Sequence, residues 1–458
     1  APVITSPAFK SKRFAVLGLA RSGAAAAEAL LASGAEVIAW DRQPHAREPF
    51  EGRCRLIDPL ELDLTGFAGV VVSPGVPLNS HPIGPHVWQY GLPVIGDIEL
   101  FAQARADLPP HKVVGITGTN GKSTTTALTH HILQTAGVPC LMGGNIGDPI
   151  LGQAALPEGG VYVLELSSFQ IDLTFTLDCD VAALTNITPD HLDRYADFAA
   201  YAASKERLFQ MQAHGTALIC AEDDPTAAIA DRLAAEGKPL VRVKTADLDA
   251  AGLAEGRSPS LAGPHNAQNA AVAVAICRQL GLTDAQIAAG IASYRGLPHR
   301  MERVCETGGV IYINDSKATN AASAAPALAA FPPEPAINAG APRIHWIIGG
   351  LPKEDGLGAC ADHLANVAAA YTVGEAGPMF ADLLEGQVKV ERCELISEAV
   401  RRAAEAAQPG DVVLLSPACA SYDQFRDYEK RGLHFRQMVG AITGCDTCDD
   451  DASRSILP

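Results

Sequence analysis

Residues 115–126 read GITGTNGKSTTT. The apolar run KVVGIT predicts a buried strand, GTNG predicts a turn, and the following residues predict a helix that begins at Lys122. Strand, glycine turn and helix N-terminus in this order are typical of a phosphate-binding loop. The spacing is unusual, because Ile116 stands where the common loop has its first glycine. We therefore predict a nucleotide site in which Lys122 reaches the β/γ-phosphates and the Ser123 or Thr124 hydroxyl ligates Mg²⁺.

The chain around this loop alternates short apolar runs with alanine-rich stretches, which predicts an α/β protein with parallel sheets. Its 458 residues are too many for one hydrophobic core. Three blocks can be separated, divided by the link LPPHK and by the segment GLPHRME. We predict three domains, residues 1–104, 105–300 and 301–458, with a disordered tail after about residue 440.

The formal net charge of −17 argues against nucleic acid or an anionic membrane as a partner. Any phosphate ligand must then be met by local groups such as loop amides and a few Lys and Arg side chains. No apolar run has the length of a membrane span, and residues 1–20 lack the pattern of a signal peptide. We expect a cytoplasmic monomer.

The eleven cysteines are scattered along the chain. Only Cys445 and Cys448 form a C-x-x-C pair, in an acidic tail without a second pair nearby. This arrangement favours a solvated tail over a zinc site. We expect the other thiols to be reduced core residues.

Two further side chains follow apolar strands of the central block. Glu165 ends VYVLE, and His191 lies in ITPDHLDRY after VAALTN. Carboxyl ends of neighbouring parallel strands share one crevice, so both side chains are candidates for the nucleotide site, with Glu165 as a Mg²⁺ ligand. A solvated loop Glu and a hydrogen-bonded core His are the alternatives. Lys205, in the helical YAASKERLF, has the local pattern of a solvated lysine.

The first block contains GLARSG at 18–23, which has the form G-x-A-x-x-G, and its second strand ends at Asp41. This is a weak dinucleotide fingerprint, and by itself it leaves two alternatives open. One is a nicotinamide-dependent oxidoreductase, and the other is a plain βαβ turn without a ligand.

Seven segments together resemble the Mur ligases of peptidoglycan synthesis, and most of all their D-glutamate-adding branch. They are GTNGKST, LELSSFQ, TNITPDHLDRY, HNAQNA, GLPHR, NDSKATN and SPACASYDQF, and the similarity runs in family order from about residue 14 to 436. The resemblance implies a Rossmann-like UDP-binding domain, a central ATPase domain, and a C-terminal Rossmann-like domain that closes over the site.

The resemblance also implies the reaction. ATP phosphorylates the free carboxylate of UDP-N-acetylmuramoyl-L-alanine, and the amine of D-glutamate then displaces phosphate from the acyl phosphate. ATP and two Mg²⁺ ions are the implied cofactors, together with a CO₂-derived carbamate on Lys205. The carbamate would turn a cation into a group that can approach Mg²⁺.

The implied sites can be given residue by residue. The catalytic residues are Lys122, Glu165, His191 and Lys205, and the metal ligands are Ser123, Glu165, His191 and carbamylated Lys205. The ATP residues are Gly118, Thr119, Asn120, Gly121, Lys122, Ser123, Thr124, Asn266, Asn269, Arg300, Asp315 and Lys317. The UDP-substrate residues are Gly18, Arg21, Ser22, Asp41, Ser73, Pro74, Gly75, Asn145 and His191. The glutamate residues are Thr319, Lys353, Ser421, Tyr422 and Tyr428, and His299 lines the closed site.

Two positions depart from the family pattern. The segment GGLPK has Leu351 where many members have an acid, although Lys353 keeps its register, and Arg42-Gln43 follows Asp41 where Thr-Arg is common. The D-N-P-R motif expected of the diaminopimelate- or lysine-adding branch is not found. A folylpolyglutamate synthase, which shares the ATPase domain, is the nearest alternative. A P-loop ATPase that acts as a mechanical or regulatory module is another.

Overall fold

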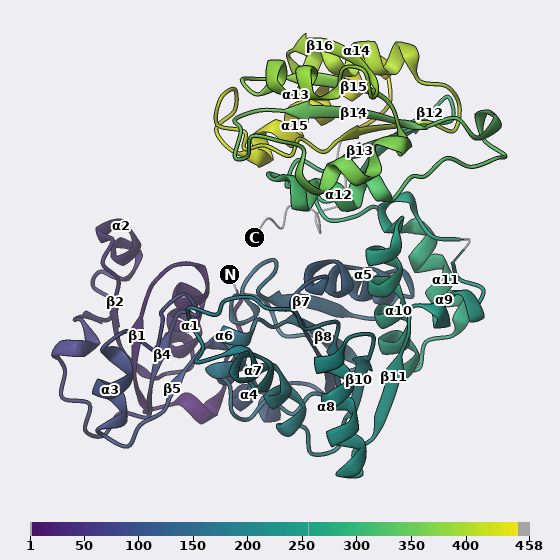
Figure 1. The fold of residues 1–458 in the computed structure, drawn as a ribbon. Coiled ribbons are helices and arrows are strands. Elements are labelled where there is room, and N and C mark those ends of the chain that lie inside the picture. Colours follow the sequence, from purple (N-terminus) through teal and green to yellow (C-terminus); the bar gives the residue numbers. More distant parts are fainter. Residues whose placement is uncertain (1, 255, 448–458) are drawn as a thin grey trace. The chain divides into compact units, whose positions relative to one another are not determined.

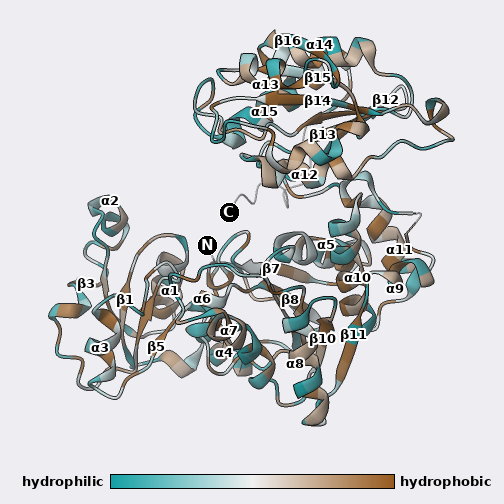
Figure 2. Ribbon diagram, viewed as in Figure 1, coloured by the Kyte–Doolittle hydropathy of each residue, from teal (hydrophilic) through white to brown (hydrophobic). Residues whose placement is uncertain are grey.

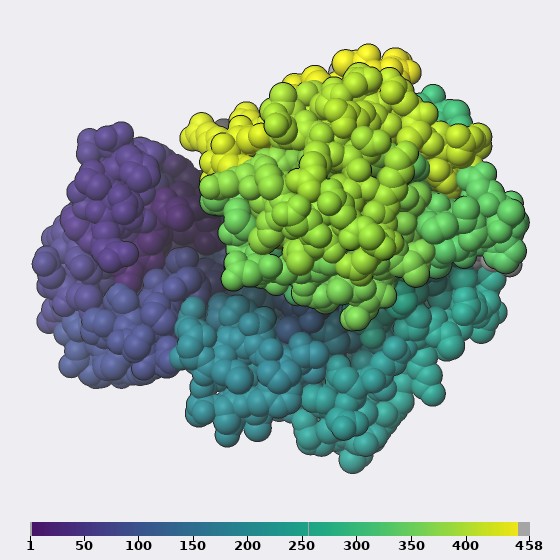
Figure 3. Space-filling view, turned by 45° about the horizontal axis from the view of Figure 1, so that its top comes forward, coloured from purple at the N-terminus to yellow at the C-terminus, as the bar shows by residue number. Residues whose placement is uncertain are grey.

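The computed structural model describes residues 2–254 and 256–447. Three sheets dominate the described part, with helices packed on them (Figure 1). This part of the chain divides into two compact units, one made of residues 2–251 and 268–290 and the other of 252–267 and 291–447. Figure 3 shows the chain in space-filling form, with its N-terminal residues in purple and its C-terminal residues in yellow. The predicted α/β class with parallel sheets is confirmed.

The first sheet has the strand order β3-β2-β1-β4-β5, and all its pairs are parallel. Its strands β3 and β5 span only two residues each, whereas the other three span four or five. The strands are β1 Arg13–Leu17, β2 Glu36–Trp40, β3 Arg55–Leu56, β4 Gly69–Val72 and β5 Val94–Ile95. The helices are α1 Arg21–Ala32, α2 Pro44–Arg47, α3 Ile83–Trp88 and α4 Asp97–Ala104.

The second sheet, with the order β11-β10-β9-β6-β8-β7, is also parallel throughout. Its central strand β6 lies between β8 and β9, so the ends of these strands are neighbours. The strands are β6 His111–Thr117, β7 Cys140–Gly144, β8 Gly160–Glu165, β9 Val181–Leu184, β10 Thr216–Cys220 and β11 Leu240–Val243. The helices are α5 Lys122–Thr135, α6 Ser168–Asp172, α7 Phe198–Gln210, α8 Asp224–Ala235, α9 Ala246–Ala250, α10 Pro264–Gln279 and α11 Asp284–Ser293.

The third sheet has the order β12-β13-β17-β14-β15-β16, with β12 antiparallel to β13 and the other pairs parallel. Apolar clusters line both faces, and the central strands are strongly hydrophobic in Figure 2. The strands are β12 Glu302–Thr307, β13 Val310–Asn314, β14 Ile344–Gly349, β15 Val367–Val373, β16 Lys389–Glu394 and β17 Val412–Leu415. The helices are α12 Ala321–Ala329, α13 Gly377–Leu384, α14 Ile396–Ala406 and α15 Tyr428–Thr443.

The end of the described chain differs from the sequence expectation. Helix α15 continues to Thr443, and Thr447 hydrogen-bonds to Arg436, so order persists beyond residue 440. Cys445 forms a disulfide with Cys305 of β12, across a sequence separation of 140 residues. The expectation of a reduced thiol is therefore wrong for Cys305, and the expectation of a solvated tail is wrong at Cys445, because the packing of α15 on β12 brings the two cysteines together. Cys448 and the rest of the predicted tail, residues 448–458, lie outside the described residues.

No helix in the described part of the chain is long and apolar enough to cross a membrane.

Candidate functional site

The predicted phosphate loop (residues 118–121) leads from β6 into α5, and the helix begins at Lys122 as expected. Lys122 Nζ donates to the carbonyl oxygens of Gly118 at 2.9 Å and Thr119 at 3.2 Å. Gly121 has a φ of 80°, and a Cβ there would lie 2.1 Å from Asn269 Oδ1. Glycine is required at this position by both the backbone conformation and the close approach of Asn269.

A hydroxyl and a carboxylate meet beside the loop. Ser123 Oγ, in the first turn of α5, lies 3.1 and 3.0 Å from the two carboxylate oxygens of Glu165 at the end of β8. They meet because Ile116 pairs with Glu165 across the sheet. Thr124 is half-buried in the same turn. These oxygen ligands suit Mg²⁺, which commonly takes one or two carboxylates and completes its shell with phosphate oxygens and water.

The described residues contain no larger cluster of side chains that could ligate a metal ion. Among residues 2–254 and 256–447, no cluster of three or more His, Cys, Asp or Glu side chains could hold a metal ion.

The loop is tied to the next strand end by a residue that the sequence reasoning missed. Asn186 Oδ1 accepts from Asn120 N at 2.8 Å, and Asn186 Nδ2 donates to Asn120 O at 3.0 Å. Thr119 Oγ1 receives a hydrogen bond from Thr188 N and lies 3.0 Å from Tyr201 OH. Asn186 stands within TNITPDHLDRY, one of the segments that carry the family resemblance. Its place in that segment is the signal that could have identified it as a site residue.

Lys205 is not solvated, in contrast to its local sequence pattern. It is 1% exposed in α7, and its Nζ donates to Gly118 O at 2.8 Å. Burial, together with the neighbouring Lys122 charge, lowers the pKa of this ammonium to about 7, although Asp190 and Asp172 oppose the shift. Both Lys122 and Lys205 thus donate to the same carbonyl oxygen of the phosphate loop.

His191 lies in the loop after β9 with a φ of 52°. Its ring packs against Phe169, with centroids 4.9 Å apart, and lies 6.4 Å from the ring of Tyr201. Its Nε2 is 3.4 Å from Asp190. The side chain is about half exposed, and Tyr201 is also the ring over which Lys205 Nζ lies at 5.0 Å. His191 and Lys205 thus share one aromatic neighbour.

The predicted UDP-substrate residues connect the first sheet with the second. Arg21 donates to Gly147 O at 3.0 Å and pairs with Asp148. Asn145 N donates to Glu165 O at 2.7 Å, which joins the predicted muramoyl end to the predicted metal ligand. Asp41 accepts from Leu19 N and Gln43 N, so its carboxylate holds the glycine-rich turn.

The other predicted residues of this group surround that turn. Ser22 stands second in α1, and a Cβ on Gly18 would lie 3.3 Å from Ser73 Cβ. Gly75 is exposed next to Pro74. The sequence reasoning missed Arg194, which donates to Pro74 O and Val76 O at 3.1 Å each.

The two asparagines of α10 have different surroundings. Asn269 is buried, and its Oδ1 lies 3.5 Å from Thr125 Oγ1 beneath the phosphate loop. Asn266 donates to Ala262 O at 3.2 Å, within the other unit.

Three loops at the carboxyl ends of β13, β14 and β17 gather the residues predicted for the third sheet. We call residues 315–320, 349–353 and 416–423 the third-sheet loops. Asp315 accepts from Met301 N and Ser416 Oγ, and burial raises its pKa to about 7. Lys353 Nζ donates to Thr319 Oγ1 at 3.1 Å, so two predicted glutamate residues are in contact.

The remaining third-sheet residues vary in exposure. Ser421 is buried, whereas Tyr422 is 69% exposed. The Tyr428 ring lies 5.8 Å from Lys317 Nζ and 5.9 Å from the ring of His299. Arg300 is half-buried and forms an isolated β-bridge with Leu297.

Leu351, the departure from the family pattern, has a backbone role. Its N–H donates to Ala420 O at 2.8 Å, and Ala420 N donates back to Leu351 O at 3.0 Å. This antiparallel bridge joins the loop after β14 to the loop after β17. It needs no acidic side chain.

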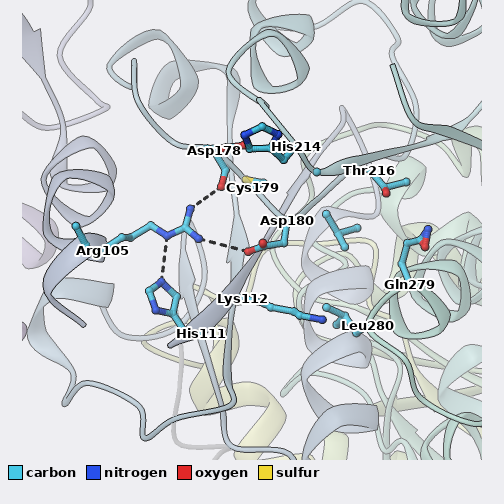
Figure 4. A pocket seen from close by; sticks show the side chains of 13 residues that line it. Arg105, His111, Lys112, Asp178, Cys179, Asp180, His214, Thr216, Gln279 and Leu280 are labelled. Carbon is cyan, nitrogen blue, oxygen red and sulfur yellow. Dashed lines mark hydrogen bonds and ion pairs between the residues drawn. The ribbon is translucent and has the colours of Figure 1, made fainter. Parts of the chain in front are cut away.

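A cavity of about 550 Å³ lies at the amino ends of strands β6, β9 and β10 of the second sheet, whereas the phosphate loop follows the carboxyl end of β6 (Figure 4). Arg105 spans one side, donating to His111, to Asp178 O and to Asp180. Lys112 also lines it. None of the sequence-predicted site residues does, so the candidate site is at the other strand ends.

Known proteins resemble this chain over nearly its whole length. Models of the Mur ligase middle domain and of the Mur ligase glutamate ligase domain match residues 116–277 and 299–419. The UDP-N-acetylmuramoylalanine–D-glutamate ligase of Novosphingobium aromaticivorans is 61% identical over 96% of this chain and 97% of that protein. Ligases of the same name from Sphingopyxis alaskensis and Zymomonas mobilis are 59% and 52% identical, over 96% of this chain and all of each relative.

Solved structures of other ligases share the fold. A UDP-N-acetylmuramoyl-L-alanyl-D-glutamate–2,6-diaminopimelate ligase is 18% identical with a TM-score of 0.55, over 95% of this chain and 94% of that one. A UDP-N-acetylmuramate–alanine ligase from Thermotoga maritima is 17% identical with a TM-score of 0.53, over 94% and 99%. With relatives at 52–61% identity, the chain belongs to the Mur ligase family, among the UDP-N-acetylmuramoylalanine–D-glutamate ligases.

Proposed function

We propose that this protein is an ATP-dependent ligase that joins D-glutamate to UDP-N-acetylmuramoyl-L-alanine in the synthesis of peptidoglycan precursors. One observation carries the proposal. The Ser123–Glu165 pair stands beside Lys122 at a phosphate loop, and Asn145 of the substrate side hydrogen-bonds the Glu165 backbone. A nucleotide and the substrate carboxylate can therefore meet at one point.

The chemistry requires positive charge between two anions. The substrate carboxylate attacks the γ-phosphorus, the bond to the β,γ-bridging oxygen breaks, and ADP leaves. The glutamate amine, having lost its proton, then attacks the carbonyl carbon, and inorganic phosphate leaves. Lys122 would turn from its own loop carbonyls towards the phosphates and offset their charge. The N-terminus of α5 and the amides of residues 118–121 favour the same anion.

We assign Mg²⁺ to Ser123 and Glu165, and a second ion to His191 with Lys205. Bound Mg²⁺ would neutralise phosphate charge during transfer. An unmodified Lys205 ammonium would repel a cation. A carbamate removes this conflict, since the neutral amine adds CO₂, gives up one proton and becomes an anion. The burial of Lys205 supports this assignment, because it keeps the amine partly neutral near pH 7.

Each of the three predicted domains contains one of the three sheets, and we assign one ligand to each domain. We assign residues 1–104 to UDP, residues 105–300 to ATP, and residues 301–458 to glutamate. Gly18, Asp41 and the 73–75 turn would bind UDP. The contact between Thr319 and Lys353 supports a glutamate carboxylate site in the third-sheet loops.

The rival functions are less well supported. Relatives at 52–61% identity do not favour a folylpolyglutamate synthase, a nicotinamide oxidoreductase or a mechanical ATPase. We propose a monomer that works in the cytoplasm, where ATP is supplied.

Phosphate release from ATP with UDP-N-acetylmuramoyl-L-alanine tests the proposal. It should appear with D-glutamate, with ADP in equal amount, and not with L-glutamate, D-aspartate, lysine or meso-diaminopimelate. Lys122→Ala should abolish it, whereas Lys112→Ala, an exposed change at the other end of β6, should not. UDP should also raise the unfolding temperature, which a folate ligase would not show. Phosphate release with none of these amino acids would refute the proposal.

A further inference from the structure

Arg431 in α15 is one of the largest fully buried side chains of the protein, with 2% of its surface exposed. Buried arginines are usually held by carboxylates. Arg431 forms no ion pair with any carboxylate of the described residues. All its side-chain hydrogen bonds instead go to neutral oxygen atoms.

These hydrogen bonds join two of the third-sheet loops. Arg431 Nε donates to Ser316 Oγ at 3.0 Å, and one terminal nitrogen donates to Ser316 O at 2.8 Å. The other terminal nitrogen donates to Cys419 O at 2.9 Å. Ser316 stands between Asp315 and Lys317, and Cys419 stands two residues before Ser421. The planar guanidinium thus fixes the loop after β13 against the loop after β17.

The third loop closes over the same side chain. A Cβ on Gly350 would lie 3.2 Å from an Arg431 terminal nitrogen and 2.4 Å from Ala420 O, so only glycine lets the backbone pass here. The next residue, Leu351, forms its bridge with Ala420. Lys353 follows two residues later. One guanidinium therefore lies beneath all three loops.

The charge of this guanidinium persists. Burial lowers the pKa of Arg431 to about 10, which still leaves it protonated near neutral pH. Asp423, the acid whose charge opposes this shift, accepts a hydrogen bond from Glu375 N at 2.9 Å. A fixed positive charge under three loops favours a ligand with carboxylates above them.

We propose that Arg431 is the positioning residue of the amino-acid site, which it builds by joining the third-sheet loops and which its charge makes selective for an anionic amino acid. The inference rests on the proposed function, since Thr319, Lys353 and Ser421 are assigned there to glutamate. Arg431 acts through these residues and does not itself touch the substrate.

The test compares Arg431→Lys with Arg343→Lys in the full chain. Arg343 is also buried in this unit, but next to the amino end of β14, where it donates to Gly410 O. Lysine keeps the charge and loses the fork that reaches two loops. Arg431→Lys should raise the KM for D-glutamate about tenfold or more, the effect of losing a charge-assisted hydrogen bond, and leave the KM for the UDP-substrate unchanged. Arg343→Lys should change neither KM.

Hydrogen exchange separates this inference from the proposed function. Arg431→Lys should speed deuterium uptake in peptides that cover residues 315–320, 349–353 and 416–423, and Arg343→Lys should not. This measurement needs no catalysis, so it remains decisive if the unaltered protein releases no phosphate with D-glutamate. Unchanged deuterium uptake in the three loops would overturn the inference that Arg431 joins them. Faster uptake with an unchanged KM for D-glutamate, in an active protein, would overturn the role in the amino-acid site.

Discussion

Lys205 and Arg431 are buried cations that stand behind strand-end loops of different sheets. Lys205 donates to Gly118 O of the phosphate loop, and Arg431 donates to Ser316 and to Cys419 O of the third-sheet loops. Neither is paired with a carboxylate at hydrogen-bond distance within the described residues. Burial lowers the pKa of both, to about 7 for the lysine and about 10 for the arginine.

The difference between these values separates two uses of a buried cation. Near neutral pH a large fraction of Lys205 is a free amine, which can form a bond at its nitrogen. Arg431 stays charged, and its rigid fork suits the fixing of geometry. The chain thus has a modifiable nitrogen beside the proposed metal site and a permanent charge beneath the proposed amino-acid site.

Lys205→Arg removes this difference and should have the largest effect. An arginine at this position stays charged and cannot form the carbamate, so a cation would face the proposed Mg²⁺ site. We expect phosphate release to fall by about 100-fold or more, the scale of losing one electrostatic group in the transition state. Lys112→Arg, an exposed change on β6, is the control. Full activity of Lys205→Arg would show that the carbamate is not required.

The dependence on CO₂ sharpens the comparison. Below about pH 7 Lys205 is mostly protonated, so each further unit should cut the reactive amine about tenfold. Activity in CO₂-depleted buffer should therefore fall more steeply with acid than activity with bicarbonate, and Lys205→Arg should show no bicarbonate response. A protein indifferent to bicarbonate at every pH would contradict the carbamate.

The same shift affects stability. Between pH 7 and about 10.4 the unfolded chain binds a proton at Lys205 that the folded chain lacks, so the free energy of unfolding should rise with pH over this window. Asp190 and Asp172 oppose the shift, and Lys122 adds to it. Lys205→Met should remove this contribution in denaturant titrations. An unchanged slope would mean that the lysine is not buried as a free amine.

Contiguous signals made part of the molecule predictable. The strand, turn and helix around Lys122 could be read from one segment, and the family that the seven motifs suggested is confirmed by the relatives and the family models. The burial of Lys205 could not be predicted from the sequence, because it depends on the packing of α7 on the phosphate loop. The role of Arg431 could not be predicted for the same reason, since its hydrogen-bond partners lie 115 and 12 residues away in the sequence. The disulfide was missed because nothing local marks Cys305 as the partner of Cys445.

Asn186 holds a strand-end loop with an uncharged side chain, in contrast to Arg431, and its removal should have a smaller effect than Lys205→Arg. Asn186 holds Asn120 of the phosphate loop through two amide hydrogen bonds, without charge. Asn186→Ala should loosen the loop and raise the KM for ATP by up to about 30-fold, since two bonds of about 1 kcal/mol each are lost. Asn366→Ala, which removes an amide hydrogen bond to Leu328 O, is the control. An unchanged KM for ATP would mean that the loop is held by its other contacts.

The smallest effect concerns the residue after Arg431. Gly432 lies inside α15, where alanine normally favours a helix. Here a Cβ would stand 2.0 Å from His299 Nδ1 and 2.9 Å from Asn314 Nδ2, so Gly432→Ala must displace a buried contact. We expect thermal or denaturant unfolding to show a loss of about 1–3 kcal/mol. Gly440→Ala is matched within the same helix, because its Cβ meets chiefly the Thr447 hydroxyl and would disturb chiefly the hydrogen bond of that hydroxyl to Arg436 O. If Gly432→Ala were the more stable of the two, the contact between α15 and His299 would be wrong, and with it the helix position from which Arg431 reaches the third-sheet loops.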